Sequence, residues 1–127
     1  AFFKFTENIL KSKKIQLFNY GECYRDYTYI DDVVNSIILL YSKMDKMNSN
    51  QIYNIGNGKP ITTISLMNLI QEKLKIKAKF ELIPPQLGDV NNTFCDNKKL
   101  LTLDEIKFTN LKEGISNYID WHLNYYK

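Results

Sequence analysis

The chain has 127 residues, 44% of them hydrophobic and 24% charged, and 17 Lys+Arg against 14 Asp+Glu give a formal net charge of +3. This composition indicates one ordinary globular domain and excludes a disordered, collagen-like or disulfide-dense chain. The charge is too small to indicate a nucleic-acid partner. No apolar run approaches the roughly 20 residues that span a bilayer, so we expect no membrane segment. Two distant cysteines and no recognisable export signal predict reduced thiols and a cytoplasmic location.

The first part of the chain predicts two helices around a pair of strands. Apolar spacing favours a helix over residues 2–13, and residues 15–18 form a short strand. A turn leads to a second strand over residues 24–30, so the two strands are expected to form a hairpin. Asp31 and Asp32 then indicate the start of a helix, as an N-cap and first-turn acids. The stripe expected to face the core from this helix is Val33, Val34, Ile37, Ile38 and Tyr41.

The second part continues the alternation of strands and helices. Residues 51–55 read as a strand, and Thr62 or Thr63 is expected to cap the helix that follows. A strand over residues 79–83 is stopped by two prolines. Asp96 is expected to cap a short helix, and Thr109 or Asn110 to start the last one. Interleaved strands and helices of this kind predict a mixed α/β fold.

Several catalytic patterns are absent from the sequence. Gly56-Asn57-Gly58 follows a predicted strand, but Ile61 stands where a dinucleotide fingerprint needs its third glycine, so we expect a tight turn. No Tyr-x-x-x-Lys occurs. The single histidine, His122, excludes a His-rich metal site and is expected to be a helix-surface or packing residue. The chain is therefore expected to hold no catalytic residues of its own.

Two polar positions nevertheless suit a nucleotide sugar. Arg25 is the only arginine beside 16 lysines, and its planar fork suits the two-point recognition of a diphosphate. A structural ion pair explains a solitary arginine equally well. Asp89 follows Gly88, and its carboxylate can accept hydrogen bonds from two ribose hydroxyls.

Several stretches resemble one known family. The stretch Gly21–Asp32, GECYRDYTYIDD, resembles a block of the extended short-chain dehydrogenase/reductase family, the NAD-dependent nucleotide-sugar epimerases and dehydratases. The same likeness extends to the opening AFFKFTENIL and to residues 53–57, 86–90, 96–100 and 117–121. Within that family the chain looks most like the UDP-glucuronate 4-epimerases.

The resemblance implies an NAD-binding Rossmann domain, absent from this sequence, and a smaller C-terminal domain for the UDP-sugar, which residues 1–127 would form. NAD is implied for the intact enzyme, with none bound to this chain alone. Arg25 would contact the diphosphate, Gln86 the phosphates and Asp89 the ribose. The strand Gln16-Leu17-Phe18 would meet the base. The implied partners are the UDP-sugar and a separate or missing N-terminal Rossmann domain.

Two alternatives and one surface property remain open. The chain suits a UDP-glucose 4-epimerase or a nucleotide-sugar 4,6-dehydratase, or a split-gene product that binds without catalysis. Phe2, Phe3 and Phe5 are too many apolar side chains for one helical stripe to bury. We therefore expect self-association through this helix, unless it packs against the strand at residues 15–18 and leaves the chain monomeric.

Overall fold

The computed structural model describes residues 1–46 and 50–126. Its helices are α1 (Phe2–Leu10), α2 (Ile30–Ser42), α3 (Thr63–Leu74), α4 (Lys98–Leu101) and α5 (Leu111–Tyr125). Its strands are β1 (Ile15–Leu17), β2 (Tyr24–Arg25), β3 (Ile61–Thr62) and β4 (Phe80–Leu82). Short 3-10 helices span Phe18–Gly21 and Met44–Lys46. The predicted mixed α/β fold is confirmed.

The strands form two small sheets rather than the predicted hairpin. β1 pairs in parallel with β4, and β2 pairs antiparallel with β3. After β1, Asn19, Tyr20 and Gly21 have φ values of 48°, 56° and 82°. Successive left-handed residues redirect the chain, and β2 comes to lie beside β3 instead of β1. The hairpin prediction is therefore wrong, and only residues 24–25 of the predicted second strand are a strand.

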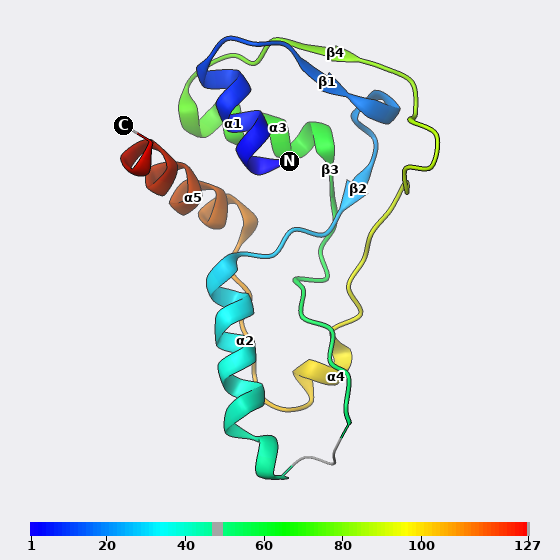
Figure 1. Cartoon of the computed structure of the whole chain (residues 1–127), viewed down its shortest axis with the longest axis vertical. Coiled ribbons are helices and arrows are strands. Elements are labelled where there is room, and N and C mark those ends of the chain that lie inside the picture. The colour runs from blue at the N-terminus through cyan, green and yellow to red at the C-terminus, as the bar shows by residue number, and fades with distance from the viewer. Residues whose placement is uncertain (47–49, 127) are drawn as a thin grey trace.

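The apolar core lies in the part of the molecule that holds α1, β1, β4, α3 and α5, which we call the packed half (Figure 1). Its helices bury residues at i, i+4 spacing, as an amphipathic helix does: Phe5 and Ile9 in α1, Leu66 and Ile70 in α3, Ile115 and Ile119 in α5. β1 adds the alternate residues Ile15 and Leu17. Met67 and Ala78 complete the core.

Two helix caps in the packed half follow the sequence. The Thr62 side chain accepts a hydrogen bond from the Ser65 N–H at 3.2 Å, and Asn110 accepts one from the Lys112 N–H at 2.9 Å. Each side-chain oxygen satisfies a backbone donor in the first turn of its helix. These contacts confirm the predicted starts of α3 and α5.

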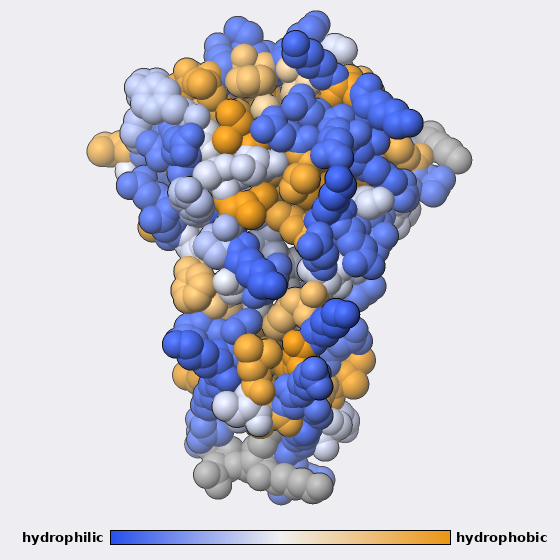
Figure 2. Space-filling model, turned by 180° about the vertical axis from the view of Figure 1, so that it is seen from behind, coloured by the Kyte–Doolittle hydropathy of each residue, from blue (hydrophilic) through white to orange (hydrophobic). Residues whose placement is uncertain are grey.

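A second part, which we call the extended half, holds α2, residues 50–60 and α4, and forms the narrow end of the molecule (Figure 1). α2 buries two polar residues, Asp32 and Ser36. Its apolar residues Ile30, Val34, Ile37, Ile38 and Tyr41 are 45 to 76% exposed. Four of the five residues of the predicted stripe are thus exposed and the fifth, Val33, is only partly buried, so the prediction that this stripe faces the core is wrong. The covered side of α2 carries the buried Asp32 and Ser36 together with the partly buried Leu39 and Leu40. Apolar residues reach the surface of the narrow end among polar ones (Figure 2).

The start of α2 also differs from the prediction. Tyr29 is the N-cap and makes no side-chain cap hydrogen bond. Asp32 instead accepts hydrogen bonds from the Thr109 N–H at 2.9 Å and the Thr109 hydroxyl at 2.8 Å. Its carboxylate therefore joins the first turn of α2 to the segment that leads into α5, while Asp31 stays exposed in the first turn.

The predicted strand at residues 51–55 is absent from the described chain, and side-chain contacts replace a strand ladder there. The Asn54 amide donates to the Asp96 carbonyl at 3.2 Å, and the Lys99 ammonium donates to the Ile52 carbonyl at 2.9 Å. In the short helix α4 the N-cap is Asn97, although the Asp96 carboxylate accepts from the Lys98 N–H at 3.2 Å.

The helix α1 packs more of its aromatic residues than the sequence suggested. Phe5 is buried, and the ring of Phe2 lies edge-on to Tyr27 with centroids 5.0 Å apart. Phe3 is half exposed and contacts the ring of His122. His122 is buried, and its Nε2 lies 2.8 Å from the Glu7 carboxylate, which confirms a packing role. Within residues 1–46 and 50–126, none of the helices is both long and apolar enough to cross a membrane.

Candidate functional site

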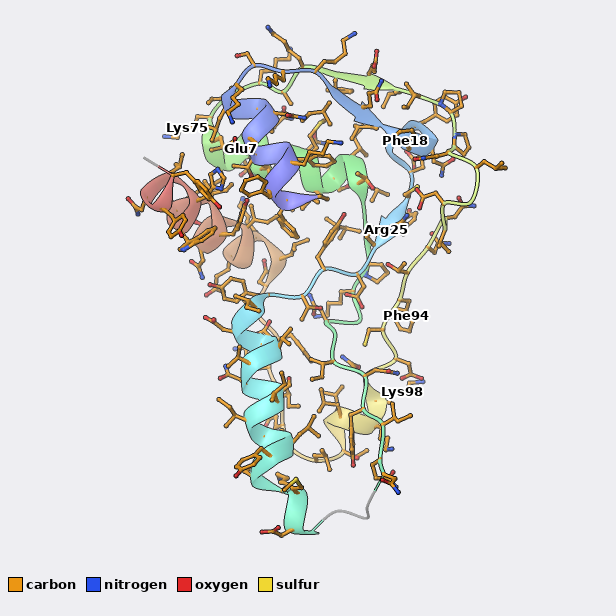
Figure 3. All side chains as sticks on the ribbon, viewed as in Figure 1. Glu7, Phe18, Arg25, Lys75, Phe94 and Lys98 are labelled. Carbon is orange, nitrogen blue, oxygen red and sulfur yellow. The ribbon has the colours of Figure 1, made fainter. Side chains whose placement is uncertain are left out.

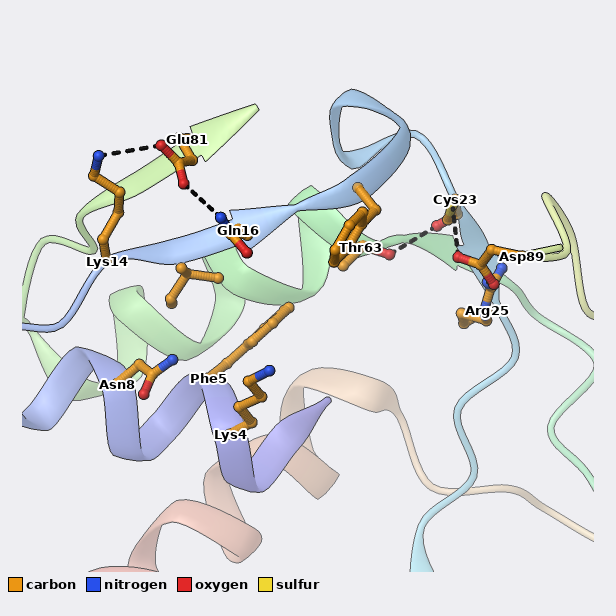
Figure 4. A pocket seen from close by; sticks show the side chains of 12 residues that line it. Lys4, Phe5, Asn8, Lys14, Gln16, Cys23, Arg25, Thr63, Glu81 and Asp89 are labelled. Carbon is orange, nitrogen blue, oxygen red and sulfur yellow. Dashed lines mark hydrogen bonds and ion pairs between the residues drawn. The ribbon is translucent and has the colours of Figure 1, made fainter. Parts of the chain in front are cut away.

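A cleft of about 430 Å³ opens between α1, β1 and β2, and four of the six predicted site residues line it. These are Gln16, Phe18, Arg25 and Asp89 (Figures 3 and 4). The remaining lining residues are Lys4, Phe5, Asn8, Lys14, Ile15, Cys23, Thr63 and Glu81. The parallel β1–β4 pair and the β2–β3 pair bring these distant segments together.

Arg25 is held by three contacts at the edge of the cleft. Its Nη2 donates to the Asp89 carboxylate at 2.8 Å, and its Nη1 donates to the carbonyls of Tyr24 at 2.9 Å and Asn91 at 3.2 Å. A guanidinium has five N–H donors, so two remain available to a ligand. Both predicted roles, diphosphate contact and structural ion pair, are compatible with this geometry.

Asp89 lies in a loop that the backbone holds against β2. The Tyr24 N–H donates to the Asn91 carbonyl at 2.9 Å, and the Thr93 N–H donates to the Tyr24 carbonyl at 3.1 Å. One Asp89 oxygen is bonded to Arg25, and the other lies 3.9 Å from the Cys23 sulfur. That second oxygen keeps most of its capacity to accept hydrogen bonds.

Gln86 and Leu17 do not line the cleft. The Asp89 N–H donates to the Gln86 carbonyl at 3.1 Å, closing a turn in which Gln86 is exposed and Asp89 reaches the cleft. The Leu17 side chain is fully buried in the core. Leu17 therefore offers no side-chain contact to a ligand in the cleft.

The free edge of β1 borders the same cleft. In the parallel register, the Ile15 N–H bonds to Lys79 and the Leu17 carbonyl accepts from Ile83. Parallel ladders use alternate residues, so the backbone N–H and carbonyl of Gln16 point away from β4. An extended donor–acceptor pair is thereby presented on the open side of the strand.

An ion pair and a hydrogen bond that the sequence analysis did not predict join β1 and the residue before it to β4 beside the cleft. The Glu81 carboxylate accepts from the Gln16 amide at 2.9 Å and from the Lys14 ammonium at 3.1 Å (Figure 4). These two hydrogen bonds lower the pKa of Glu81. Predicting these contacts required the parallel register that sets Glu81 opposite Gln16. The sequence analysis predicted both strands but paired residues 15–18 with residues 24–30 instead.

The glycines at residues 56–58 serve packing and a turn. A Cβ on Gly56 would lie 2.5 Å from Cys95 Cβ, and Gly58 has a φ of 71°. The Gly58 N–H donates to the Asp26 carboxylate at 2.9 Å, so it is not free to bind a phosphate. Within residues 1–46 and 50–126, no group of three or more metal-ligating side chains is assembled.

The sequence of this chain is similar to those of known proteins. Residues 1–56 match the NAD dependent epimerase/dehydratase family. The chain is 39% identical to an uncharacterized protein of Methanocaldococcus jannaschii, covering 97% of this chain and 37% of that protein. It is 33% identical to UDP-glucuronate 4-epimerase 4 of Arabidopsis thaliana, covering 99% of this chain and 32% of the enzyme.

Two solved structures share the fold. UDP-glucose 4-epimerase of Thermotoga maritima, solved with UDP-glucose, superposes with a TM-score of 0.84 at 30% identity, covering 99% of this chain and 40% of that one. UDP-glucose 4-epimerase of Thermus thermophilus, solved with NAD, gives a TM-score of 0.79 at 26% identity, covering 94% of this chain and 38% of that one.

Fold and sequence together place the chain with the NAD-dependent epimerases and dehydratases. It belongs to the NAD-dependent epimerase/dehydratase family and matches the C-terminal part of that family's structures. The chain spans 37 to 43% of the length of the first three curated relatives that it matches.

Proposed function

We propose that this chain is the UDP-sugar-binding portion of an NAD-dependent sugar epimerase, most like UDP-glucuronate 4-epimerase. The observation that carries the proposal is the cleft in which Gln16, Phe18, Arg25 and Asp89 meet from separate parts of the chain. A cleft of this size, with an aromatic ring and a few polar groups, suits a small ligand.

Each part of the nucleotide has a group in the cleft that suits it. The free N–H and carbonyl of Gln16 suit the donor and acceptor edge of a uracil, with the Phe18 ring nearby. The two remaining donors of Arg25 suit the diphosphate, and the second Asp89 oxygen suits a ribose hydroxyl. Leu17 makes no proposed contact, because its side chain lies in the core and its carbonyl already accepts from Ile83. Gln86 has no place in the proposed contacts because its side chain lies outside the cleft.

The residues of this chain do not fit NAD. The glycine turn lacks the third glycine of a fingerprint, and the Gly58 N–H already bonds to Asp26. We therefore place NAD and the catalytic residues of the intact enzyme on an N-terminal Rossmann domain. The exposed apolar face of α2 is the surface that we expect this domain to cover, because such a face is normally buried against a partner.

A second candidate is a UDP-glucose 4-epimerase, favoured by the Thermotoga maritima structure. The 4,6-dehydratases among the solved structures that share the fold are dTDP-glucose enzymes, so that alternative is tested with dTDP. Isothermal calorimetry of the chain with UDP-glucuronate, UDP-glucose, UDP and dTDP separates these candidates. UDP-glucuronate should bind best, and a preference for UDP-glucose or dTDP would favour the corresponding alternative. We expect no epimer from the chain alone.

Arg25 provides the sharpest test of the site. Arg25→Ala should weaken UDP binding by roughly tenfold or more, since a hydrogen-bonded charge pair is worth about 1.5–3 kcal/mol. Arg25→Lys should lose nearly as much because the planar fork is lost. Lys112→Ala is the control, since Lys112 pairs with Glu72 away from the cleft. Equal UDP affinity for the parent chain and Arg25→Ala would show that Arg25 is only structural, and failure of every UDP ligand to bind would refute the proposal.

A further inference from the structure

The charges that line the cleft do not cancel. Its cations are Lys4, Lys14 and Arg25, and its anions are Glu81 and Asp89. Lys14 pairs with Glu81 at 3.1 Å, and Arg25 pairs with Asp89 at 2.8 Å. In residues 1–46 and 50–126, no carboxylate lies within ion-pair distance of the Lys4 ammonium. The cleft therefore keeps one uncompensated positive charge, and Lys4 carries it.

Lys4 also lies where a ligand in the cleft would meet it. It stands on α1 one turn before Asn8, so the two side chains share a helix face, and both line the cleft. The close view shows Lys4, Phe5 and Asn8 rising from α1 towards β1 (Figure 4). Lys11, farther along the same helix, is instead paired with Glu7.

The nucleotide proposed above brings more negative charge than Arg25 alone can meet. Asp89 already neutralises Arg25, and three of its five N–H donors are in use. Lys14 is likewise neutralised by Glu81. A diphosphate entering this cleft would thus find its free cation on α1. An ammonium binds phosphate as a point charge on a flexible stem and needs no fixed geometry.

We propose that Lys4 is a ligand-binding residue whose ammonium contacts the phosphates and makes the cleft select a charged nucleotide over the uncharged nucleoside. The inference rests on the proposed function, because it assumes that the cleft receives a nucleoside diphosphate. It adds a residue that lies outside both the stretch at residues 21–32 and the loop at residues 86–90.

The test measures UDP and uridine affinities of the 127-residue chain by calorimetry at low and moderate salt. Lys4→Gln should weaken UDP binding by roughly five- to tenfold and leave uridine binding within about twofold. Lys4→Arg should keep most of the UDP affinity, since the charge is kept. Lys13→Gln is the matched control: it removes the same charge from an exposed residue outside the cleft and should change UDP affinity by less than about twofold. The loss in Lys4→Gln should shrink as salt screens the contact.

Each other outcome overturns the inference in a distinguishable way. Unchanged UDP binding in Lys4→Gln refutes the role of Lys4 and leaves the proposed function standing. Equal losses for UDP and uridine, or an equal loss in Lys13→Gln, would show a structural or a general charge effect instead. If the parent chain binds uridine but not UDP, or binds neither, the proposed function fails as well.

Discussion

The packed half and the extended half use the same kinds of residue in opposite ways. In the packed half, one apolar stripe on each of α1, α3 and α5 faces the other two helices and is almost fully buried. In the extended half, α2 buries Asp32 and Ser36 and exposes Ile37 and Ile38. The first half supplies its own core, whereas α2 carries an apolar face that the described chain does not cover.

This difference indicates where the chain depends on a partner. An amphipathic helix is stabilised mainly by burial of its apolar face, so α3 and α5 stabilise each other while α2 gains little from its own stripe. None of the residues that line the cleft belongs to α2, and α2 lies at the other end of the molecule from β1 and β4 (Figure 1). Ligand binding by the cleft and contact with a partner through α2 are thus separate properties that can be tested separately.

The largest expected contrast is between a core residue of α3 and an apolar residue of α2. Leu66 is fully buried, and Leu66→Ala should lower the free energy of unfolding by about 2–5 kcal/mol, through lost transfer energy and a cavity. Ile37 is 54% exposed, and Ile37→Ala should change it by less than about 0.5 kcal/mol. Urea unfolding followed by circular dichroism measures both.

A large loss in Ile37→Ala would contradict this picture and show that the α2 face is covered in solution. Sedimentation at several concentrations would then identify a second copy as the cover. Self-association stays a prediction, but the surface expected to mediate it is now α2 rather than α1. Of its three phenylalanines α1 exposes Phe3 alone, whereas α2 exposes several apolar residues.

A middle-sized effect is expected where the two halves join. Asp32→Ala removes two hydrogen bonds to Thr109 and leaves the Thr109 N–H unpaired, so it should cost about 1–3 kcal/mol of unfolding free energy. Asp31→Ala, at an exposed site in the same helical turn, should cost at most about 1 kcal/mol, through the helix dipole. Equal effects of the two changes in thermal unfolding would refute the junction role of Asp32.

The smallest expected effect is a pH-dependent change in stability that depends on Glu81. Its folded pKa lies below the ordinary 4.5 because Gln16 and Lys14 donate to its carboxylate. A lowered folded pKa adds stability above the unfolded pKa, and that stability is lost as pH falls through the folded value. Glu81→Gln should therefore melt slightly below the parent at pH 7, and the two melting temperatures should converge as the pH falls below 4.5 and through the folded pKa of Glu81. A gap that persists at low pH would mean that the ion pair with Lys14 is not its cause.

Local patterns predicted the helices of the packed half well. Thr62 and Asn110 cap as expected because capping depends on a few neighbouring residues. The pairing of the strands could not be predicted in this way, since β1 finds its partner in residues 80–82. Periodicity in α2 identified an amphipathic helix correctly, but periodicity does not say whether a cover is present.

The candidate site shows the same division between local patterns, which the sequence reveals, and contacts between distant segments, which it does not. Arg25 and Asp89 were found from residue chemistry and the family resemblance, and the structure brings them to one cleft as an ion pair. Gln86 is exposed in the turn at residues 86–89 and lies outside the cleft, so its phosphate contact stays a prediction without support from the cleft. Glu81 and Lys4 were missed because their proximity depends on strand register and on the packing of α1, which no motif records.

The hydrogen bonds of the Asp26 carboxylate have a consequence for how the chain folds. Its carboxylate accepts from the Gly58 N–H at 2.9 Å and the Cys95 N–H at 3.0 Å, and thus ties together three distant stretches of sequence. Contacts between residues far apart in sequence slow folding, because the ends of a long loop must meet first. During synthesis, β1 and β2 leave the ribosome long before β4 and residue 95. β1 must therefore wait unpaired until residues 80–82 have emerged, and β2 until residues 61–62 have. The cleft is thus among the last features to form.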